Sequence, residues 1–419
     1  MHLKKLILWY LKGALIVPII IRIAYGSIDS TVDSIVHPGL FIHLAVLFLL
    51  SHYFLLRKIV HRDKLNLISK MVFVFFIVYS INLSAIEILL FSNLFPLSSI
   101  QYTLKLFLFL LISFYVYQNH QFFRSRFNRI LKINSWVLIL NIVLGYHFNI
   151  GWQSYGNLEG TYRGFLAGND TSIFSFVVFG FSLFSIITEK KHQKILSIAL
   201  FGLSIYSMYI IATKAIFIAG IICILFILNK QSVKKDIISS IILLIMISSV
   251  VAFIINSSQF QERIVVNYLI QKQQSERMID AMVEIPKFMM WMNQIAPSRA
   301  IRGFMLLNQL VHDNPLNLLF GYGVSGIHQI FGRPPMAHLF SIIGHYGVIG
   351  FSVFYLPQFI HAWQLVMKRN FTVINVLYIS VFLYGSLGGF LYNHSNSSII
   401  FALLFALSLS SKNITSDRS

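Results

Sequence analysis

Charged residues are scarce in this chain of 419 residues: Asp, Glu, Lys and Arg together make up 11% of it, against 57% hydrophobic residues. A soluble globular protein has about 25% charged and 45–50% apolar residues, so this class is excluded. Apolar runs of about 18 or more residues recur along most of the length, and each is long enough to cross a hydrocarbon core of about 30 Å. The alternating ten-residue segments of a membrane β-barrel are missing. We therefore expect an all-α, polytopic membrane helical bundle.

Cysteine and acidic residues are also few. Cys223 is the only cysteine and lies in an apolar run, which leaves no partner for an intramolecular disulfide. The chain has 14 acidic and 33 basic residues, which gives a net charge of +19. In a soluble protein, such a charge would suggest that the partner is a nucleic acid. In a membrane protein, basic residues collect in cytoplasmic loops instead, so we expect no nucleic-acid partner. The acids predicted on the outer side show no metal-ligand spacing, and we expect neither a metal nor a cofactor; these acids are Asp170, Asp280, Glu284 and Asp313.

About twelve transmembrane helices are predicted from the apolar runs. The first five residues lead directly into the first run without a small-residue cleavage site, so we expect this run to remain as a signal anchor. With the N-terminus in the cytoplasm, most Lys and Arg residues fall in the inner connections. The prediction is a protein of the inner (cytoplasmic) membrane with both termini cytoplasmic. The predicted spans are 6–24, 37–56, 70–91, 100–118, 130–149, 171–188, 194–211, 214–229, 237–256, 338–360, 372–391 and 396–411.

One outer connection, residues 257–337, is long, with about 80 residues, and long loops with structure of their own are usually functional. Its spacing of apolar residues predicts two amphipathic helices. The second lies in SRAIRGFMLLNQLVHDN, with Ser298 as its N-cap and Pro315 just beyond its end. The chain is thus divided into nine spans in 1–256, this outer loop, and three spans with a cytoplasmic tail in 338–419.

Six polar residues from distant parts of the chain fall in one layer at the predicted outer membrane surface. Taken singly, each also fits a simpler role: an interfacial anchor for Arg163, a solvated charge for Lys214 or Arg302. His338 also fits a helix cap. Together, cations beside the bilayer on the side away from the cytoplasm attract an anion held at that depth, such as a lipid-linked diphosphate. The six residues are Arg163, Lys214, Arg299, Arg302, His338 and His394.

Two ionisable residues lie inside predicted spans, Glu87 in the third and Lys105 in the fourth. These spans are consecutive and antiparallel, so the two side chains can meet, and ionisable groups at such depth pair with each other or serve a site. Both interpretations stay open: a structural ion pair, and a contribution of Lys105 to diphosphate binding. Of the other histidines, His345 is expected to pack between helices, and His312 and His361 to cap helices.

The stretch SRAIRGFMLLNQLVHDNPLNLLFGYG, followed by PPMAHLF and HYGVIGF, resembles the signature region of the bacterial O-antigen polymerase and O-antigen ligase families. That pattern is an Arg beginning an amphipathic helix, a Pro, a Gly-x-Gly turn, a His at the mouth of the next span, and a Tyr-Gly-x-x-Gly helix. YRGFLAGND is similar to the Arg-Gly-x-x-x-x-Asn segment of these families, whereas Thr213–Lys214 replaces their usual Ser-Arg. The matching residues are Arg299, Pro315, Gly321, Gly323, His338, Tyr346, Gly347 and Gly350, with Arg163 and Asn169.

The resemblance implies a metal-independent, inverting glycosyl transfer on the outer face of the membrane. The donor would be a glycan on undecaprenyl diphosphate, and the acceptor the non-reducing end of another lipid-linked repeat unit. The outer cations at 163, 214, 299 and 302 would hold the diphosphate, and His338 would accept the proton of the attacking hydroxyl. The motif glycines would let backbones approach closely. Expected partners are the undecaprenyl-diphosphate-linked oligosaccharide and the lipid bilayer, with a chain-length regulator and a flippase as candidates.

Three other functions stay open. An O-antigen ligase would use the same chemistry with lipid A–core as the acceptor. A transporter, such as a flippase of lipid-linked sugars, would place charges near the bilayer midplane and use broken helices. The third is a peptidoglycan polymerase of the shape-and-division type, for which the sequence contains no matching motif. Because most of the non-cytoplasmic cations fall at one face beside a structured loop, an outer-face polymerase is the function that we expect.

Overall fold

Helices dominate the computed structural model, as expected for an all-α protein. It describes residues 2–25, 38–60, 66–90, 97–153, 162–166, 168–189, 191–211, 218–222, 225, 252, 256, 269, 272–273, 299–331, 338–388 and 395–410. The helices up to the middle of the chain are α1 (His2–Lys12), α2 (Ile16–Tyr25), α3 (Pro38–Leu55), η1 (Leu56–Val60), α4 (Leu67–Ile81), η2 (Asn82–Leu90), α5 (Leu97–Gln118), α6 (His120–Arg124), α7 (Phe127–His147), α8 (Gly168–Thr188) and α9 (Lys191–Ile211), where η marks a π-helix. The later helices are α15 (Arg299–His312), α16 (Pro315–Phe320), α17 (Gly323–Phe331), α18 (His338–Phe354), α19 (Leu356–Met367), α20 (Val373–Gly388) and α21 (Ser395–Ser410). Two short strands, β1 (Trp152–Gln153) and β2 (Tyr162–Gly164), pair antiparallel between α7 and α8.

Five helices in the described part are long and apolar enough to cross a membrane, or six spans if one bent pair of helices counts as a single span. Three shorter apolar helices coincide with the predicted spans 171–188, 372–391 and 396–411. The predicted spans 214–229 and 237–256 fall largely outside the described residues, so the total of twelve stays a prediction. The candidate spans are Phe41–Lys58, Leu67–Ile86, Ile100–Gln118, Phe127–His147 and Lys194–Ile211, with the pair Leu339–Phe354 and Leu356–Met367 bent by 45°.

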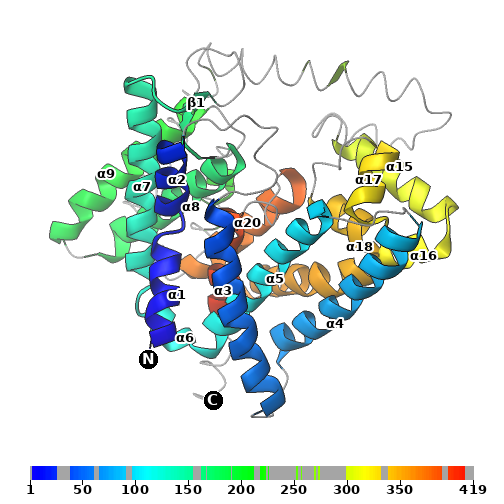
Figure 1. The fold of residues 1–419 in the computed structure, drawn as a ribbon. Helices are drawn as coiled ribbons and strands as arrows, with labels where there is room; N and C mark the ends of the chain where they lie inside the picture. The colour runs from blue at the N-terminus through cyan, green and yellow to red at the C-terminus, as the bar shows by residue number, and fades with distance from the viewer. Residues whose placement is uncertain are drawn as a thin grey trace.

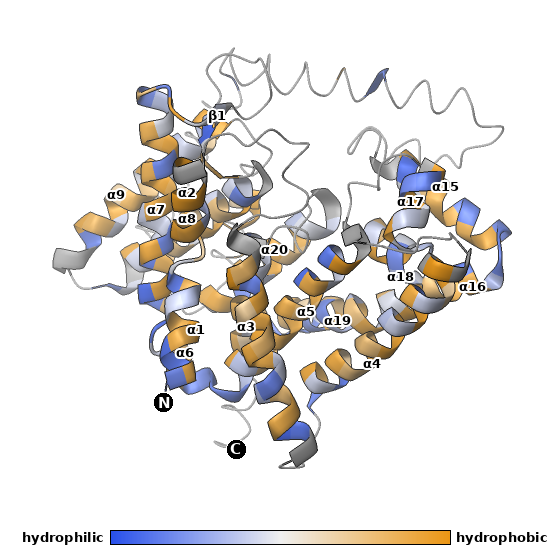
Figure 2. Cartoon of the chain, in the orientation of Figure 1, coloured by the Kyte–Doolittle hydropathy of each residue, from blue (hydrophilic) through white to orange (hydrophobic). Residues whose placement is uncertain are grey.

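The outward faces of α3 and α4 are apolar (Figure 2). On them, Phe48 is 73% exposed and Phe76 is 59% exposed. A large exposed apolar surface is a liability in water, but it is the normal surface of a helix in contact with lipid tails. Together with the long apolar helices, these faces support a membrane protein.

The first predicted span, 6–24, is wrong as a single helix, because the chain forms two. Helix α1 ends at Lys12, three turn residues follow, and α2 begins at Ile16. Gly13 at the junction is a weak helix former, and Pro18 in the first turn of α2 has no backbone N–H to donate. Each of the two helices is shorter than the bilayer core requires, so a crossing here needs both.

Helix α5 lies at the centre of the bundle, where it packs along α21 (Figure 1). Phe109 of α5 stacks on Phe401 and Phe405 of α21, with ring centres 5.4 and 6.1 Å apart. Tyr378 of α20 stacks on Phe401 at 5.5 Å. Apolar residues are spread around the whole circumference of α5 and α21, which is the pattern of a helix buried by its neighbours. This aromatic layer fixes the central helices against which the candidate site is built.

The expectation that His361 caps a helix is wrong. His361 lies inside α19, only 2% exposed, with its Nε2 2.9 Å from the Ser408 hydroxyl of α21. That hydroxyl donates in turn to Asn375 Oδ1 of α20 at 2.8 Å. Because a buried polar group needs a partner, polar side chains on three apolar helices meet in the interior. His312 does lie where a cap is expected, with its Nδ1 2.8 Å from the Asn308 carbonyl at the end of α15.

Both ends of the described chain lie beside the short helix α6 (Figure 1). In α1, Lys4 Nζ is 5.9 Å from the centre of the Phe122 ring of α6. The last helix, α21, also contacts α6. The first and the last described helices therefore both approach α6.

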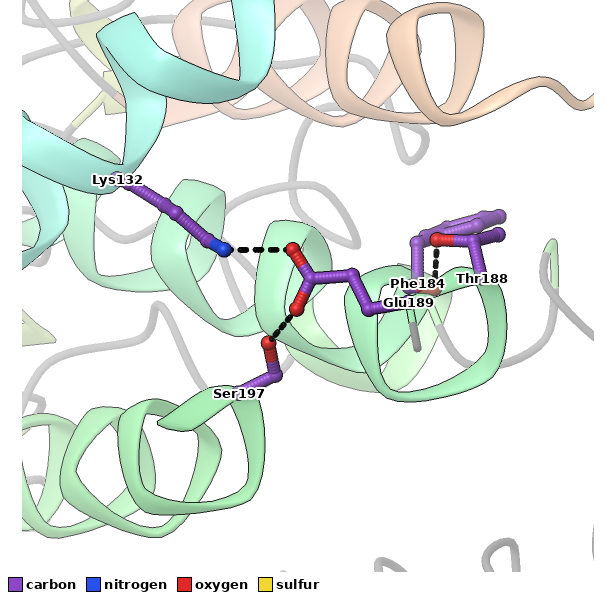
Figure 3. A network of polar contacts seen from close by, with 5 residues as sticks. All are labelled: Lys132, Phe184, Thr188, Glu189 and Ser197. Carbon is purple, nitrogen blue, oxygen red and sulfur yellow. Dashed lines mark hydrogen bonds and ion pairs between the residues drawn. The ribbon is translucent and has the colours of Figure 1, made fainter. Parts of the chain in front are cut away.

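At this same end, a polar network ties three helices together (Figure 3). Lys132 Nζ of α7 is 2.6 Å from Oε1 of Glu189, which directly follows α8. Ser197 of α9 donates to the other carboxylate oxygen of Glu189 at 2.5 Å. The ion pair is partly buried and hydrogen-bonded, so it holds the ends of α7, α8 and α9 in register.

The second half of the predicted outer loop folds into three helices, α15, α16 and α17. The predicted amphipathic helix is confirmed as α15, which ends at His312, and Pro315 begins α16 just beyond it. The three helices enclose a small apolar core with α18, while the first predicted helix of this loop lies outside the described residues. The buried members of this core are Leu306, Leu310, Tyr322 and Ile327.

Candidate active site

The helix that carries Arg299 and Arg302 lies against the first turn of α18. A Cβ atom on Gly303 would come within 2.4 Å of the Phe340 ring, so only glycine allows this approach. Helix α18 begins two residues before Phe340, at His338. Arg302 is partly buried, whereas the side chains of Arg299 and His338 are outside the described part of the structure. The fold therefore brings together the backbone segments of three predicted site residues.

Helix α18 is broken in its middle, at Gly347, where φ is 66° and ψ is −167°. Just before the break, the Gly344 carbonyl accepts a hydrogen bond from the Tyr322 N–H at 2.7 Å. The His345 carbonyl accepts one from Asn82 Nδ2 of η2 at 2.8 Å. A helix can be interrupted at membrane depth only where other groups satisfy the backbone, and here a neighbouring turn and an amide side chain do so.

Two glycines of the resemblance motif make the break possible. Gly321, between α16 and α17, has φ of 81°, and a Cβ atom there would lie 2.4 Å from the carbonyl carbon of His345. A Cβ atom on Gly347 would lie 2.3 Å from the carbonyl carbon of Leu319. The two backbones thus touch at both positions, and the expected role of these glycines in close approach is confirmed.

A group of polar atoms is buried beside the break. His345 is 2% exposed, and its ring meets the Tyr102 ring of α5 edge-on, with centres 4.5 Å apart. Within the described structure, neither ring nitrogen of His345, nor the Tyr102 hydroxyl, nor Asn82 Oδ1 has a hydrogen-bond partner. Next to them, Tyr346 OH and Thr103 Oγ1 are 2.6 Å apart. An unpartnered buried polar atom costs about 1–3 kcal/mol, so four in one place mark a site rather than ordinary packing.

Sequence reasoning predicted that His345 packs between helices but missed Tyr102 and Asn82. Both are residues with a polar group inside predicted membrane spans, and a polar group at that depth is a signal that could have identified them. The sequence does not reveal their contact with His345, because Asn82 and His345 are 263 residues apart.

Lys105 lies one turn after Tyr102 on α5 and is partly buried. The Asp170 carboxylate, at the start of α8, acts favourably on its ammonium group through space. Asp170 is 2% exposed and accepts hydrogen bonds from Asn396 and Ser397 at the start of α21. The Glu87 side chain is not among the described ones, so its pairing with Lys105 stays a prediction.

Arg163 lies in β2, on the connection before α8. Its carbonyl accepts a hydrogen bond from Asn141 Nδ2 of α7 at 2.9 Å, and its guanidinium lies over the Trp152 ring at 5.4 Å. Burial lowers the pKa of the Arg163 guanidinium below its ordinary value, and an arginine in a protein stays protonated at neutral pH. Its Nε is buried without a hydrogen-bond partner in the described structure. Arg163 is thus a fixed cation with donor capacity left for an anion.

The other predicted site residues are placed only in part. Lys214 and His394 lie outside the described residues. Arg163 lies beside α7, and Arg302 lies on α15, the helix that packs against α18. In the described portion of the chain, no group of three or more His, Cys, Asp or Glu side chains has the arrangement of a metal site.

The comparison with known proteins leaves the family open. No protein-family model matches the chain, and a search of curated proteins finds no match. The residues and contacts described above are therefore the basis on which a function is proposed.

Proposed function

We propose that the chain is a membrane glycosyltransferase that polymerises undecaprenyl-diphosphate-linked oligosaccharide repeat units into a surface polysaccharide. The observation that carries the proposal is the packing of α15 on the first turn of α18, at Gly303 and Phe340. This packing puts the helix of Arg299 and Arg302 beside the helix that begins at His338. Phosphate-binding cations beside a possible base are what such a transfer requires.

In the proposed reaction, a hydroxyl of the acceptor sugar attacks the anomeric carbon of the donor. The new C–O bond forms as the bond from that carbon to the diphosphate oxygen breaks, and its electron pair leaves with undecaprenyl diphosphate. The His338 imidazole takes the proton of the hydroxyl. Arg299 and Arg302 stabilise the charge that develops on the diphosphate, and Arg163, Lys214 and Lys105 add to the positive potential around it.

The proposed topology has about twelve spans, both termini in the cytoplasm, and the active site on the outer face of the inner membrane. It is supported by the meeting of α1 and α21 at α6. Many cations lie at that end, including Lys4, Arg126 and Lys132, as expected for the cytoplasmic side. The acceptor and donor would then reach the site from the opposite side, where α18 begins.

The first test is to delete the gene and separate the cell-surface polysaccharide on a gel, with complementation by wild type and by His338→Ala. A single-repeat band in place of the ladder, restored only by wild type, is expected. Bare core with lipid-linked long polymer accumulating would contradict the polymerase and indicate the ligase. An unchanged ladder would exclude both.

The break in α18 favours a second candidate, a flippase of the same lipid-linked sugars. Broken helices with polar groups at the break are typical of transporters, and Gly347 with buried His345 has that form. The same gel separates the two functions. Loss of a flippase removes the single-repeat band as well as the ladder, because repeat units no longer reach the outer face.

A further inference from the structure

The start of α7 is surrounded by cations. It lies at the end of α5 opposite Tyr102 and the candidate active site, just after the short helix α6. Arg126 directly precedes α7, Arg129 lies in its first turn, and Lys12 ends the neighbouring helix α1. Helix α1 is held there by Asn134 of α7, whose Nδ2 donates to the Leu11 carbonyl at 3.0 Å.

The charges at the N-terminus of α7 are unfavourable for an isolated helix. Its first turn contains no acidic residue, and the N-cap position, Arg126, makes no side-chain capping hydrogen bond. The first backbone N–H groups of a helix have no partner within it and carry a partial positive charge. Arginines at this end add repulsion where a carboxylate is normally found, so the arrangement calls for an anion from outside the helix.

Lys12 makes the excess of positive charge larger. Lys12 is only 8% exposed, and it ends the helix that Asn134 holds against α7. Side chains of a helix slope toward its N-terminus, which directs Lys12 toward the α6 end of α1. Its Nζ lies 5.1 Å from the centre of the Trp9 ring, and it has no hydrogen bond or ion pair within the described structure. The helix that carries this largely buried cation thus packs on the helix whose first turn carries Arg126 and Arg129.

The described residues supply no carboxylate to neutralise this group. Glu189, at the same end of the bundle, is already engaged by Lys132 and Ser197 (Figure 3). Arg126 uses one nitrogen, Nη1, to donate to the Phe122 carbonyl and the Ser125 hydroxyl, at 3.1 and 3.0 Å. Its other donors and the guanidinium of Arg129 remain for a ligand.

We propose that Lys12, Arg126, Arg129 and the N-terminus of α7 bind the phosphate of an anionic phospholipid headgroup. A phosphate oxygen accepts hydrogen bonds from backbone N–H groups and guanidinium donors at once. The surroundings favour a lipid over a soluble phosphate. The Trp9 ring is 71% exposed beside Lys12, and the Arg126 guanidinium lies 3.9 Å above the Phe122 ring. Aromatic rings and cations at one level are the pattern of a membrane interface.

The site is independent of the proposed function, because it is built from α1, α6 and α7 and shares no residue with the candidate active site. On the proposed topology it faces the cytoplasmic leaflet, where anionic lipids attract basic segments. A bound lipid would fix α1 against α7, so the expected consequence is stability of the N-terminal helices.

The test uses the full chain purified in a neutral detergent, with thermal unfolding and native mass spectrometry as readouts. The probes are phosphatidylglycerol, phosphatidylcholine and inorganic phosphate. The variants are Arg129→Gln and Lys12→Met. The matched control is Lys70→Gln, since Lys70 is an exposed lysine in the first turn of α4, whose N-terminus is already capped by Asn66.

Phosphatidylglycerol is expected to bind wild type and Lys70→Gln equally, and Arg129→Gln about tenfold more weakly. In phosphatidylcholine alone, Lys12→Met and Arg129→Gln should melt at or above the wild-type temperature, because a repulsion has been removed. A merely structural role for these cations would lower both melting temperatures in either lipid. Equal retention of phosphatidylglycerol by all variants would overturn the site. Equal stabilisation by inorganic phosphate would overturn the lipid as its ligand.

Discussion

Asp170, in the first turn of α8, accepts hydrogen bonds from the backbone N–H of Ser397 at 3.2 Å and from its hydroxyl, at the start of α21. Asn396 Nδ2 donates to the same carboxylate at 3.0 Å. A carboxylate is favourable at the N-terminus of a helix, and here one helix supplies it to another. The contact joins segments 226 residues apart at the level of Lys105. Asp170 therefore fixes how the last helix meets the middle of the chain.

Replacing Asp170 with Asn should destabilise the protein by about 2–3 kcal/mol, because the new amide presents donors to a cap that needs acceptors. The control is Asn308→Ala, which changes an exposed polar side chain of α15. Thermal unfolding in detergent should show a clear fall for Asp170→Asn and little for the control. Equal melting temperatures at neutral pH would mean that the buried contact contributes nothing.

Replacing Arg302 or Arg299 with Ala should reduce polymer formation by about a hundredfold while protein abundance stays unchanged, because each would lose a stabiliser of the leaving diphosphate. Arg302→Lys should recover only part of the activity, since lysine keeps the charge but not the bidentate fork. The exposed cation Lys368 provides a control in Lys368→Ala. Polysaccharide gels with an immunoblot of the tagged protein are the measurement. Wild-type ladders from both alanine variants would exclude a diphosphate clamp.

The break in α18 predicts a sharp difference between two glycines. Gly347→Ala should cost about 3 kcal/mol or more, because alanine at this φ is strained and its Cβ would meet the backbone of Leu319. A Cβ atom on Gly202, in α9, would have nothing within 4 Å, and Gly202→Ala should be neutral or stabilising by up to about 1 kcal/mol. Both substitutions add the same methyl group, so the two melting temperatures can be compared directly. A Gly347→Ala protein as stable as wild type would show that α18 runs straight.

Local signals in the sequence were enough for the elements that depend on neighbours in the chain. The helix from Arg299 to His312 was predicted because its apolar spacing and the following Pro315 are local. The long apolar runs likewise gave most of the described spans. Periodicity could not place the breaks at Gly13 and Gly347, since glycine also occurs inside continuous membrane helices.

Contacts between distant segments could not be predicted in the same way. The Gly347 break is stabilised by Asn82 of η2 and by Tyr322 of the turn between α16 and α17, and neither carries a sequence signal for this contact. A histidine near the predicted end of a span is often a helix cap, but His361 is buried and its ring contacts the Ser408 hydroxyl of α21. The candidate site could be predicted as a set of residue types on one side of the membrane. The hydrogen bonds from Asn396 and Ser397 to Asp170 could not, because they join distant segments.

The turn between α15 and α16 predicts a pH dependence. The Asp313 carboxylate accepts hydrogen bonds from the Asn314 backbone, from the Tyr322 hydroxyl at 2.9 Å and from Asn317 Nδ2 at 3.2 Å, and these bonds lower the pKa of Asp313. A carboxylate whose pKa is depressed in the folded state stabilises that state above its unfolded pKa of about 3.9. This stabilisation is lost as the pH falls below about 4 toward the depressed folded value. Because Asp313 is exposed, the effect should stay below about 1 kcal/mol.

Hydrogen exchange of residues 299–320 at pH 3 and pH 6 measures this loss. All rates are divided by the intrinsic exchange rate at the same pH. The resulting protection of wild type should be weaker at the lower pH, because protonated Asp313 no longer holds Tyr322 and Asn317. Asp313→Asn should exchange faster than wild type at pH 6 and change less between the two pH values. The control is Asn308→Ala, which removes an exposed side chain from α15 and should keep the full pH response. If Asp313→Asn kept the full pH response, another titrating group would have to cause that response. The hydrogen bonds of Asp313 would then not be what holds α15 against α17.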